Sequence, residues 1–85
     1  MNANPILLIQ VWTKGRIHPD WDSATWRQDD FGMWIKLQDY GNRDSDYGWE
    51  IDHIVPVASG GSDNIGNLRP LHWRSNTGRN ANYRL

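Results

Sequence analysis

Asp52 and His53 stand side by side in a short apolar run, and Asn67 and Asn76 follow at wider intervals. An adjacent carboxylate and imidazole can serve as a ligand for a hard cation and as a general base near neutral pH. Each residue alone has a simpler explanation: polar strand positions facing water, loop backbone hydrogen bonds for Asn67, and helix capping for Asn76. Only the joint pattern favours a site.

The strand period raises an objection to that site. Side chains alternate between the two faces of a strand, so His53 is expected on the apolar face of the run and Asp52 on the opposite face. For both to reach one substrate, the strand must end or bulge near His53. We therefore expect the alternation to break at this residue.

The stretch "EIDHIVPVASGGSDNIGNLRPLHWRSNTGR" closely resembles the HNH endonuclease motif, which builds the ββα-metal nuclease site. The family pattern is an Asp-His-Ile-x-Pro strand, a glycine-rich loop, an Asn-Leu strand and a helix bearing a third His or Asn. This sequence supplies those parts in order, and the preceding "YGWEIDHI" is similar to small stand-alone HNH proteins of bacteria and phages. The resemblance implies an α+β fold: a ββα-metal core over 49–85 after a β-rich N-terminal extension over 1–48, in one domain.

The resemblance also implies roles. His53 would be the general base that activates water, and Asp52 and Asn76 would hold one divalent cation. Mg²⁺ is favoured because the ligands are oxygens, with Mn²⁺ or another transition metal as the alternative. Asn67 would pin the loop and help to orient His53. The products would be 5′-phosphate and 3′-hydroxyl ends.

Two positions near the motif keep open roles. Glu50 is either an outer-shell or substrate-contacting carboxylate or, slightly favoured, an exposed strand residue. His72 contacts phosphate, joins a metal site or lies exposed at a strand end, and the last is narrowly favoured. Many family members bind a structural zinc through cysteine pairs; this chain has no cysteine, which excludes such a site.

The charge distribution indicates where DNA would bind. The net charge is -1, yet all ten acidic residues lie at or before Asp63. The cations beyond that point are predicted to contact DNA phosphates: Arg69, Arg74, Arg79 and Arg84. The alternative is a solvated basic helix without a partner.

The elements that must position these residues follow from pattern and turn chemistry. We expect strands at 6–12, 33–41, 49–57 and 67–71, one or two helical turns at 22–29, polar loops at 41–48 and 58–66, and a helix over 73–85. The six tryptophans are expected mainly to fill a small core.

The sequence thus predicts a metal-dependent endonuclease acting on double-stranded DNA as a monomer or homodimer. A catalytically silent DNA-binding or assembly module on the same scaffold is the alternative, and a metal-binding structural protein without DNA affinity is a third reading. The longest apolar run, "ILLIQVW", is too short to span a bilayer and lacks the flanks of a signal peptide. A cytoplasmic location without membrane contact is therefore expected.

Overall fold

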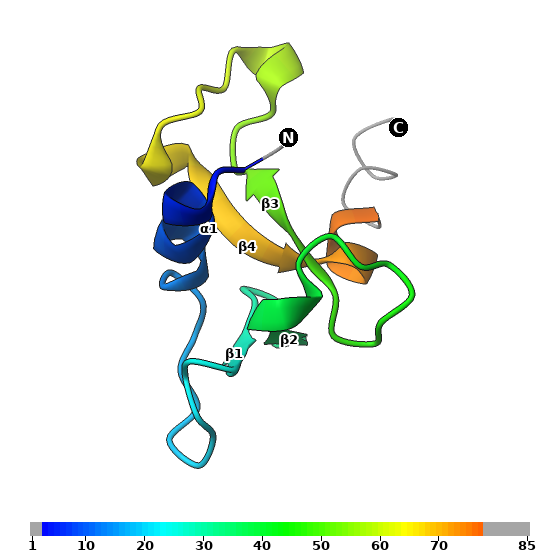
Figure 1. Ribbon diagram of the computed structural model, residues 1–85. Coiled ribbons are helices and arrows are strands. Elements are labelled where there is room, and N and C mark those ends of the chain that lie inside the picture. The colour runs from blue at the N-terminus through cyan, green and yellow to red at the C-terminus, as the bar shows by residue number, and fades with distance from the viewer. Residues whose placement is uncertain (1–2, 78–85) are drawn as a thin grey trace.

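The computed structural model describes residues 3–77, in which two antiparallel ribbons lie beside an N-terminal helix and a second helical segment follows the last strand (Figure 1). The elements are α1 (Pro5–Trp12), β1 (Trp26–Gln28), β2 (Trp34–Lys36), β3 (Trp49–His53) and β4 (Leu68–His72). Residues 73–77, directly after β4, are helical. β1 pairs with β2 and β3 pairs with β4, so each ribbon has two strands.

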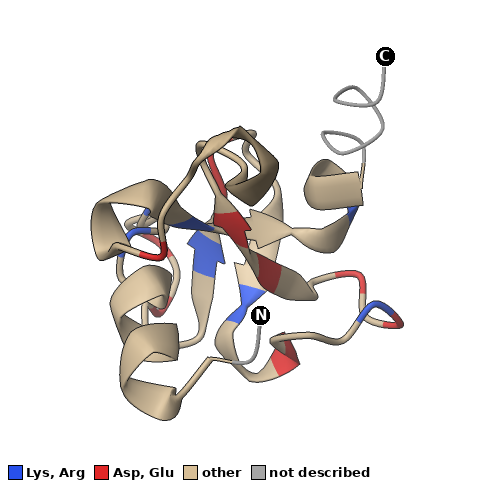
Figure 2. Ribbon diagram, turned by 90° about the horizontal axis from the view of Figure 1, so that it is seen from above, with Lys and Arg blue, Asp and Glu red and all other residues tan. Residues whose placement is uncertain are grey.

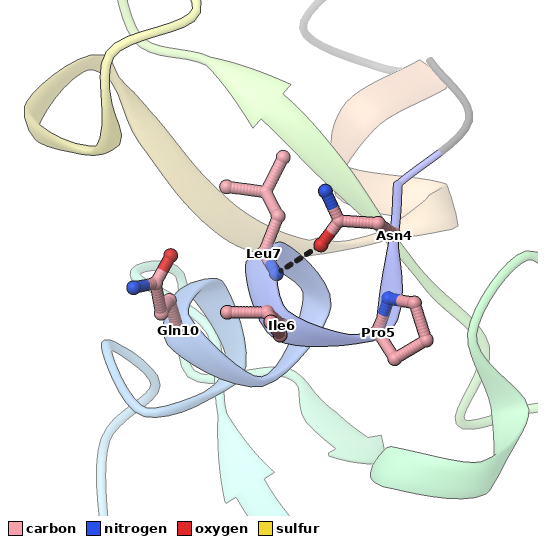
Figure 3. Close-up of a pocket in the computed structure, with 5 residues that line it drawn as sticks. All are labelled: Asn4, Pro5, Ile6, Leu7 and Gln10. Carbon is pink, nitrogen blue, oxygen red and sulfur yellow. Dashed lines mark hydrogen bonds between the residues drawn. The ribbon is translucent and has the colours of Figure 1, made fainter.

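The strand expected at 6–12 is wrong, because this segment is the helix α1. The Asn4 side chain caps the helix by accepting a hydrogen bond from the Leu7 N–H at 2.8 Å, and Pro5 occupies the first turn (Figure 3). Leu7 and Val11 lie one turn apart and face the core. The N-terminal extension is therefore mixed, with strands only at β1 and β2.

Two other boundaries differ from expectation. Residues 23–25 form a turn, and the segment from Trp26 onward is strand β1 rather than helix. Asp22 stabilises this turn because its carboxylate accepts a hydrogen bond from the Ala24 N–H. The strand predicted over 33–41 is shorter, since β2 gives way to a 3₁₀ turn at Leu37–Asp39.

The core lies between α1 and the two ribbons. Its buried members are Val11, Trp12, Ile35, Trp49, Ile51 and Leu68. The Trp12 and Trp49 rings pack at 5.3 Å between centroids. Lys14, just after α1, donates from Nζ to the Ile65 carbonyl at 2.7 Å and also to the Leu68 carbonyl. The helix is thereby fixed against the start of β4.

Asp29 joins the two ribbons through a buried carboxylate. Its Oδ1 accepts from the Phe31 and Met33 N–H groups, each at 2.9 Å, and its Oδ2 accepts from the His72 N–H at 3.0 Å. The residue is 1% exposed. One side chain thus closes the β1–β2 turn and anchors the end of β4.

Asp29→Ala is expected to lower the free energy of unfolding by about 3 kcal/mol, because one buried and two partly buried N–H groups lose their acceptor. Urea denaturation followed by tryptophan fluorescence measures this change. The matched control is Asp20→Ala, which removes an exposed carboxylate and should alter stability by less than about 0.5 kcal/mol. Equal effects of the two substitutions would contradict this role of Asp29.

Within residues 3–77, no helix has both the length and the apolar character needed to cross a bilayer. The cytoplasmic location stays a prediction from the sequence.

Candidate active site

The β3–β4 ribbon carries the motif residues in a one-to-one register. Asp52 lies opposite Arg69, and His53 lies opposite Leu68 at the end of the ladder. Opposed residues share a face of an antiparallel ribbon, so Asp52 and Arg69 lie on one face and His53 on the other. The expected break in alternation at His53 is therefore absent from the ladder. The strand does end there, and the chain turns away after it.

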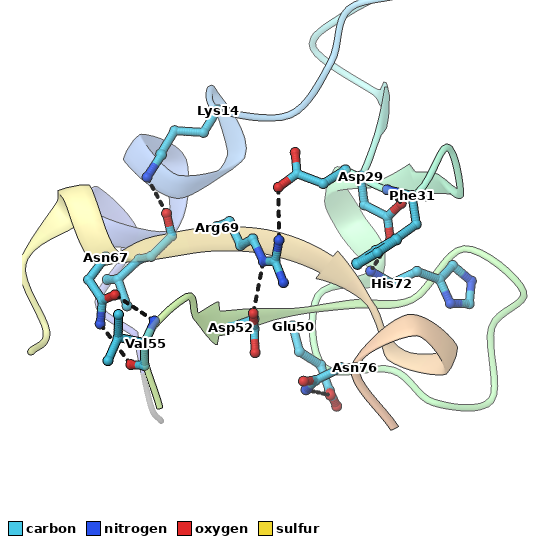
Figure 4. A network of polar contacts seen from close by, with 12 residues as sticks. Lys14, Asp29, Phe31, Glu50, Asp52, Val55, Asn67, Arg69, His72 and Asn76 are labelled. Carbon is cyan, nitrogen blue, oxygen red and sulfur yellow. Dashed lines mark hydrogen bonds and ion pairs between the residues drawn. The ribbon is translucent and has the colours of Figure 1, made fainter. Parts of the chain in front are cut away.

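Asp52 is buried and ion-paired. Its Oδ2 lies 2.9 Å from Arg69 Nε, and Arg69 NH1 lies 3.1 Å from Asp30 Oδ2 (Figure 4). The guanidinium also stacks 5.4 Å from the Phe31 ring centroid. Burial opposes the charge on Arg69, but the hydrogen bonds to the two carboxylates outweigh it and raise the Arg69 pKa. Phosphate contact by Arg69 would require these pairs to open.

Glu50 lies on the same face as Asp52, two residues earlier in β3. Arg43 binds it in a bidentate pair, at 2.7 Å from Nε and 2.8 Å from NH2. Asn76 Nδ2 donates to Glu50 Oε1 at 2.8 Å. Burial raises the Glu50 pKa, but the hydrogen bonds from Arg43 and Asn76 outweigh it and lower the pKa overall. The slightly favoured reading of Glu50 as an exposed carboxylate is wrong, because its side chain is 21% exposed and fully engaged.

The C-terminal helical segment thus returns to β3. Asn76 comes from this segment and meets Glu50 across 26 positions of sequence. Figure 4 shows the side chains of Asp52, Glu50 and Asn76 extending to the same side of the ribbon. Three oxygen-bearing residues of the motif therefore gather on one face.

His53 stands at the open end of β3 rather than inside the apolar core. Its Nε2 lies 2.7 Å from Asp63 Oδ1, and its side chain is 18% exposed. Asp63 belongs to the loop between the two strands and is itself well exposed. An imidazolium at His53 would donate to this carboxylate in a charge-assisted hydrogen bond.

Asn67 closes the long loop between β3 and β4. Its Oδ1 accepts from the Val55 N–H at 2.8 Å, while Nδ2 donates to the carbonyls of Val55 at 3.1 Å and Ser62 at 2.8 Å. Its own carbonyl accepts from the Ile54 N–H, the residue after His53. Asn67 thus ties the exit of β3 to the loop. A Cβ at Gly61 would overlap the Val55 carbonyl, which explains a glycine there.

The expectation that His72 is an exposed strand-end residue is wrong. The residue is fully buried. Its Nδ1 accepts from the Arg74 N–H at 3.0 Å, which leaves Nε2–H to donate to the Asp46 carbonyl at 2.7 Å. A neutral ring with both nitrogens engaged caps the helical segment and is closed to substrate and metal.

The remaining predicted DNA contacts fall in two groups. Arg74 is half exposed, pairs with Asp46 at 3.0 Å and stacks over Trp73 at 4.7 Å. Arg79 and Arg84 lie outside the described residues. Acidic and basic residues are interspersed over the described part of the chain (Figure 2). Of the predicted DNA-contacting arginines within residues 3–77, Arg74 is the one whose side chain is exposed enough for a phosphate to approach it.

The donor chemistry fits a hard cation better than a soft one. Within residues 3–77, no cluster of three or more His, Cys, Asp or Glu side chains could hold a metal. The oxygen-bearing side chains on this face of β3 that would hold a cation are the Asp52 carboxylate and the Asn76 amide, with the Glu50 carboxylate beside Asn76. An all-oxygen set of this kind suits Mg²⁺ or Mn²⁺.

Sequence reasoning missed the partners that hold these residues. Arg43 lies in the polar segment "GNRDSDYG", and Asp63 lies in "SGGSDNIG". Both segments read as ordinary turn sequences, and no local pattern indicates a contact with Glu50 or His53. Asp63 had one available signal, its position in the loop bounded by the two motif strands.

Comparison with known proteins agrees with the motif. The HNH endonuclease family model matches residues 38–82, which is more than half of the chain. No curated protein and no solved structure matches the chain. The matched range includes β3, β4 and every residue discussed above for the site except Asp30, Phe31 and Arg84.

Proposed function

Because the chain belongs to the HNH endonuclease family, we propose that it is a metal-dependent DNA endonuclease with its site at the end of β3. The observation that carries the proposal is the contact between Asn76 and Glu50 at 2.8 Å. It brings the third part of the motif to the strand that bears Asp52 and His53. The proposal is supported by a carboxylate and an amide on one face of β3, together with an imidazole at the end of the same strand.

Asp52 and Asn76 would hold one divalent cation, Mg²⁺ in our proposal, with Glu50 as an outer partner. When bound, such a cation supplies Lewis-acid neutralisation of charge on the phosphate and on the leaving oxygen. Arg69 orients the Asp52 carboxylate, since its guanidinium is fixed by Asp30 on the other side. The ligand side chain is thereby held before the cation arrives.

His53 would take the proton from the attacking water. β3 ends at His53, so our proposal places the phosphate at this end of the strand, between Asp52 on one face and His53 on the other. Asp63 fixes the ring through Nε2 and would stabilise the imidazolium formed. Asn67 fixes the backbone immediately after His53. The base is therefore positioned by two groups of the same loop.

The reaction type is tested by the chemistry of the ends. Double-stranded DNA nicked by the protein should be resealed by DNA ligase and extended by DNA polymerase, because hydrolysis that breaks the P–O3′ bond leaves 5′-phosphate and 3′-hydroxyl ends. Nicks that are resealed only after phosphatase and kinase treatment would contradict this assignment of the products.

A catalytically silent DNA-binding module is the second candidate. The observation that favours it is that both site carboxylates are already neutralised, Asp52 by Arg69 and Glu50 by Arg43. Under this reading, the wild-type protein binds DNA without cleaving it at any metal concentration. The substitution of His53 then has no activity to remove.

Arg43→Ala is expected to strengthen Mn²⁺ binding by about fivefold, because it removes a cation that competes for Glu50. Isothermal titration calorimetry without DNA measures the affinity. Arg74→Ala is the matched control, since it removes an arginine that pairs with Asp46 instead. An unchanged or weaker affinity in the Arg43 variant would show that Glu50 lies outside the field of the cation.

A further inference from the structure

An aromatic hollow occupies the outward face of the β1–β2 ribbon, apart from the nuclease residues. Arg27 pairs with Ile35, and Ile35 is fully buried, so that face of the ribbon points to the core. Trp26, Trp34 and Lys36 fall on the opposite face by alternation. Together with side chains from two loops, these tryptophans line a hollow of about 260 Å³: Trp21, Trp26, Trp34 and Tyr47.

The rings of the hollow meet edge to face. Trp26 and Tyr47 pack at 4.9 Å and 88°, and Trp21 and Trp34 pack at 5.8 Å and 65°. Trp21 is 53% exposed and Tyr47 is 42% exposed. None of these rings belongs to the buried core cluster of residues 3–77. Exposed aromatic side chains gathered into one patch are typical of ligand-binding or interaction sites.

The charge around the hollow selects its ligand. Aromatic walls accept either a flat π-system or a cation. No lining residue is acidic, and Lys36 Nζ lies 5.5 Å from the Trp26 ring centroid, where it repels a cationic ligand and attracts a phosphate. Asp22, next to Trp21 in sequence, is engaged by the Ala24 N–H and the Thr25 hydroxyl. A nucleotide fits both features, because its base can stack on the aromatic rings and its phosphate can pair with Lys36.

The hollow is continuous with the strand that bears the nuclease residues. Tyr47 lines the hollow and precedes Glu50 of β3 by three positions. The Lys36 N–H donates to the Tyr47 carbonyl at 3.0 Å, which fixes β2 to the segment entering β3. The hollow therefore lies next to the segment that enters β3, and His53 lies at the other end of that strand. Figure 1 shows the β1–β2 ribbon on the side of the molecule where β3 begins. A DNA substrate that runs along β3 would extend from the nuclease residues to the hollow.

We propose that the aromatic hollow binds an unpaired nucleobase of the DNA substrate. A paired base keeps its faces stacked inside the duplex, so only a single-stranded extension, gap or flap can present a free face to the rings. The inference rests on the proposed nuclease function and names its substrate class. DNA with an unpaired segment beside the cleaved strand is the preferred substrate.

The test compares two DNA probes in EDTA, where hydrolysis is prevented. One probe is a blunt duplex, and the other is the same duplex with a thymidine extension that carries one 2-aminopurine, whose fluorescence falls on stacking. Wild type should bind the extended probe more tightly and quench it. Trp21→Ala should weaken that binding by about tenfold, with less than about a twofold change for the blunt duplex.

Three further variants separate stacking from folding and from general charge. Trp21→Phe should keep most of the affinity because a ring is retained, whereas Lys36→Met should weaken extended-probe binding and keep the folded state. Ile6→Ala is the matched control, since it removes an exposed apolar side chain on α1. Circular dichroism melting checks that every variant is folded.

Any one of the following results would overturn the inference. Equal losses on both probes would mean general DNA contact, and Trp21-dependent binding of a trimethyllysine peptide without quenching of the extended probe would mean a cation site. If wild type cleaves plasmid but shows no preference for the extended probe, only this inference fails. If wild type neither binds nor cleaves DNA, the proposed function fails with it.

Discussion

His53→Ala is expected to reduce cleavage of supercoiled plasmid by about 10²- to 10⁴-fold, because general-base catalysis contributes on that order. DNA affinity measured in EDTA should stay within about threefold, since the imidazole is a small part of any DNA contact surface. The free energy of unfolding should fall by less than about 1 kcal/mol, because the substitution removes one exposed hydrogen bond to Asp63.

Retained cleavage in the His53 variant would assign the base to another group. If His53→Ala loses both cleavage and folding, the more conservative variant His53→Asn tests the role of the imidazole. This variant can still accept or donate to Asp63 but cannot take up a proton near neutral pH. We expect it to be as inactive as the alanine variant and as stable as wild type.

Asp52→Asn is expected to weaken Mn²⁺ binding by more than about tenfold and to reduce cleavage by about 10²-fold or more, because the charged ligand is lost. Stability should fall by only about 1–2 kcal/mol, since Arg69 keeps its pair with Asp30 and the amide oxygen still accepts a hydrogen bond. Calorimetry gives the affinity without reference to activity.

The matched control for Asp52 is Asp44→Asn, which removes an exposed carboxylate from the loop 41–48. Metal affinity and cleavage in that variant should equal those of wild type. If Asp52→Asn and Asp44→Asn weaken metal binding equally, the cation is attracted by the overall negative charge of the protein and not by a specific ligand. The assignment of Asp52 as a ligand would then be wrong.

The β3–β4 ribbon was predictable because its information is local. In β3 the apolar residues Trp49 and Ile51 alternate with Glu50 and Asp52, and the strand expected at 49–57 ends at His53. Gly60 adopts φ 89° at the turn, and the returning strand begins directly after Asn67. The family motif added the position of Asn76, which no periodicity gives. Ordered agreement over one continuous stretch therefore sufficed for the core of the site.

The N-terminal helix was not predictable from apolar content alone. The run "ILLIQVW" suits a strand by its branched residues, but Asn4 and Pro5 precede it as a helix cap and first turn. The structure resolves the choice because Leu7 and Val11 meet the core on one helical face. The helix was therefore indicated by Asn4 and Pro5 and not by the pattern of apolar residues.

The burial of His72 and the ion pairing of Arg69 depend on long-range contacts that cannot be predicted from the spacing of residues in the sequence. His72 is buried because Asp29 and Asp46 reach it from segments 43 and 26 positions away. Arg69 is committed to Asp52 and Asp30 rather than to solvent. Both residues sit at positions that suit a DNA surface in the linear pattern. Tertiary pairing decided their roles.

The most direct test of the central claim is a supercoiled-plasmid assay of the wild-type protein with Mg²⁺ and Mn²⁺, at several salt concentrations. The account predicts conversion to relaxed or linear DNA that needs the cation, stops in EDTA and is absent with His53→Ala. Intact plasmid under every condition, from protein shown to be folded, would contradict it.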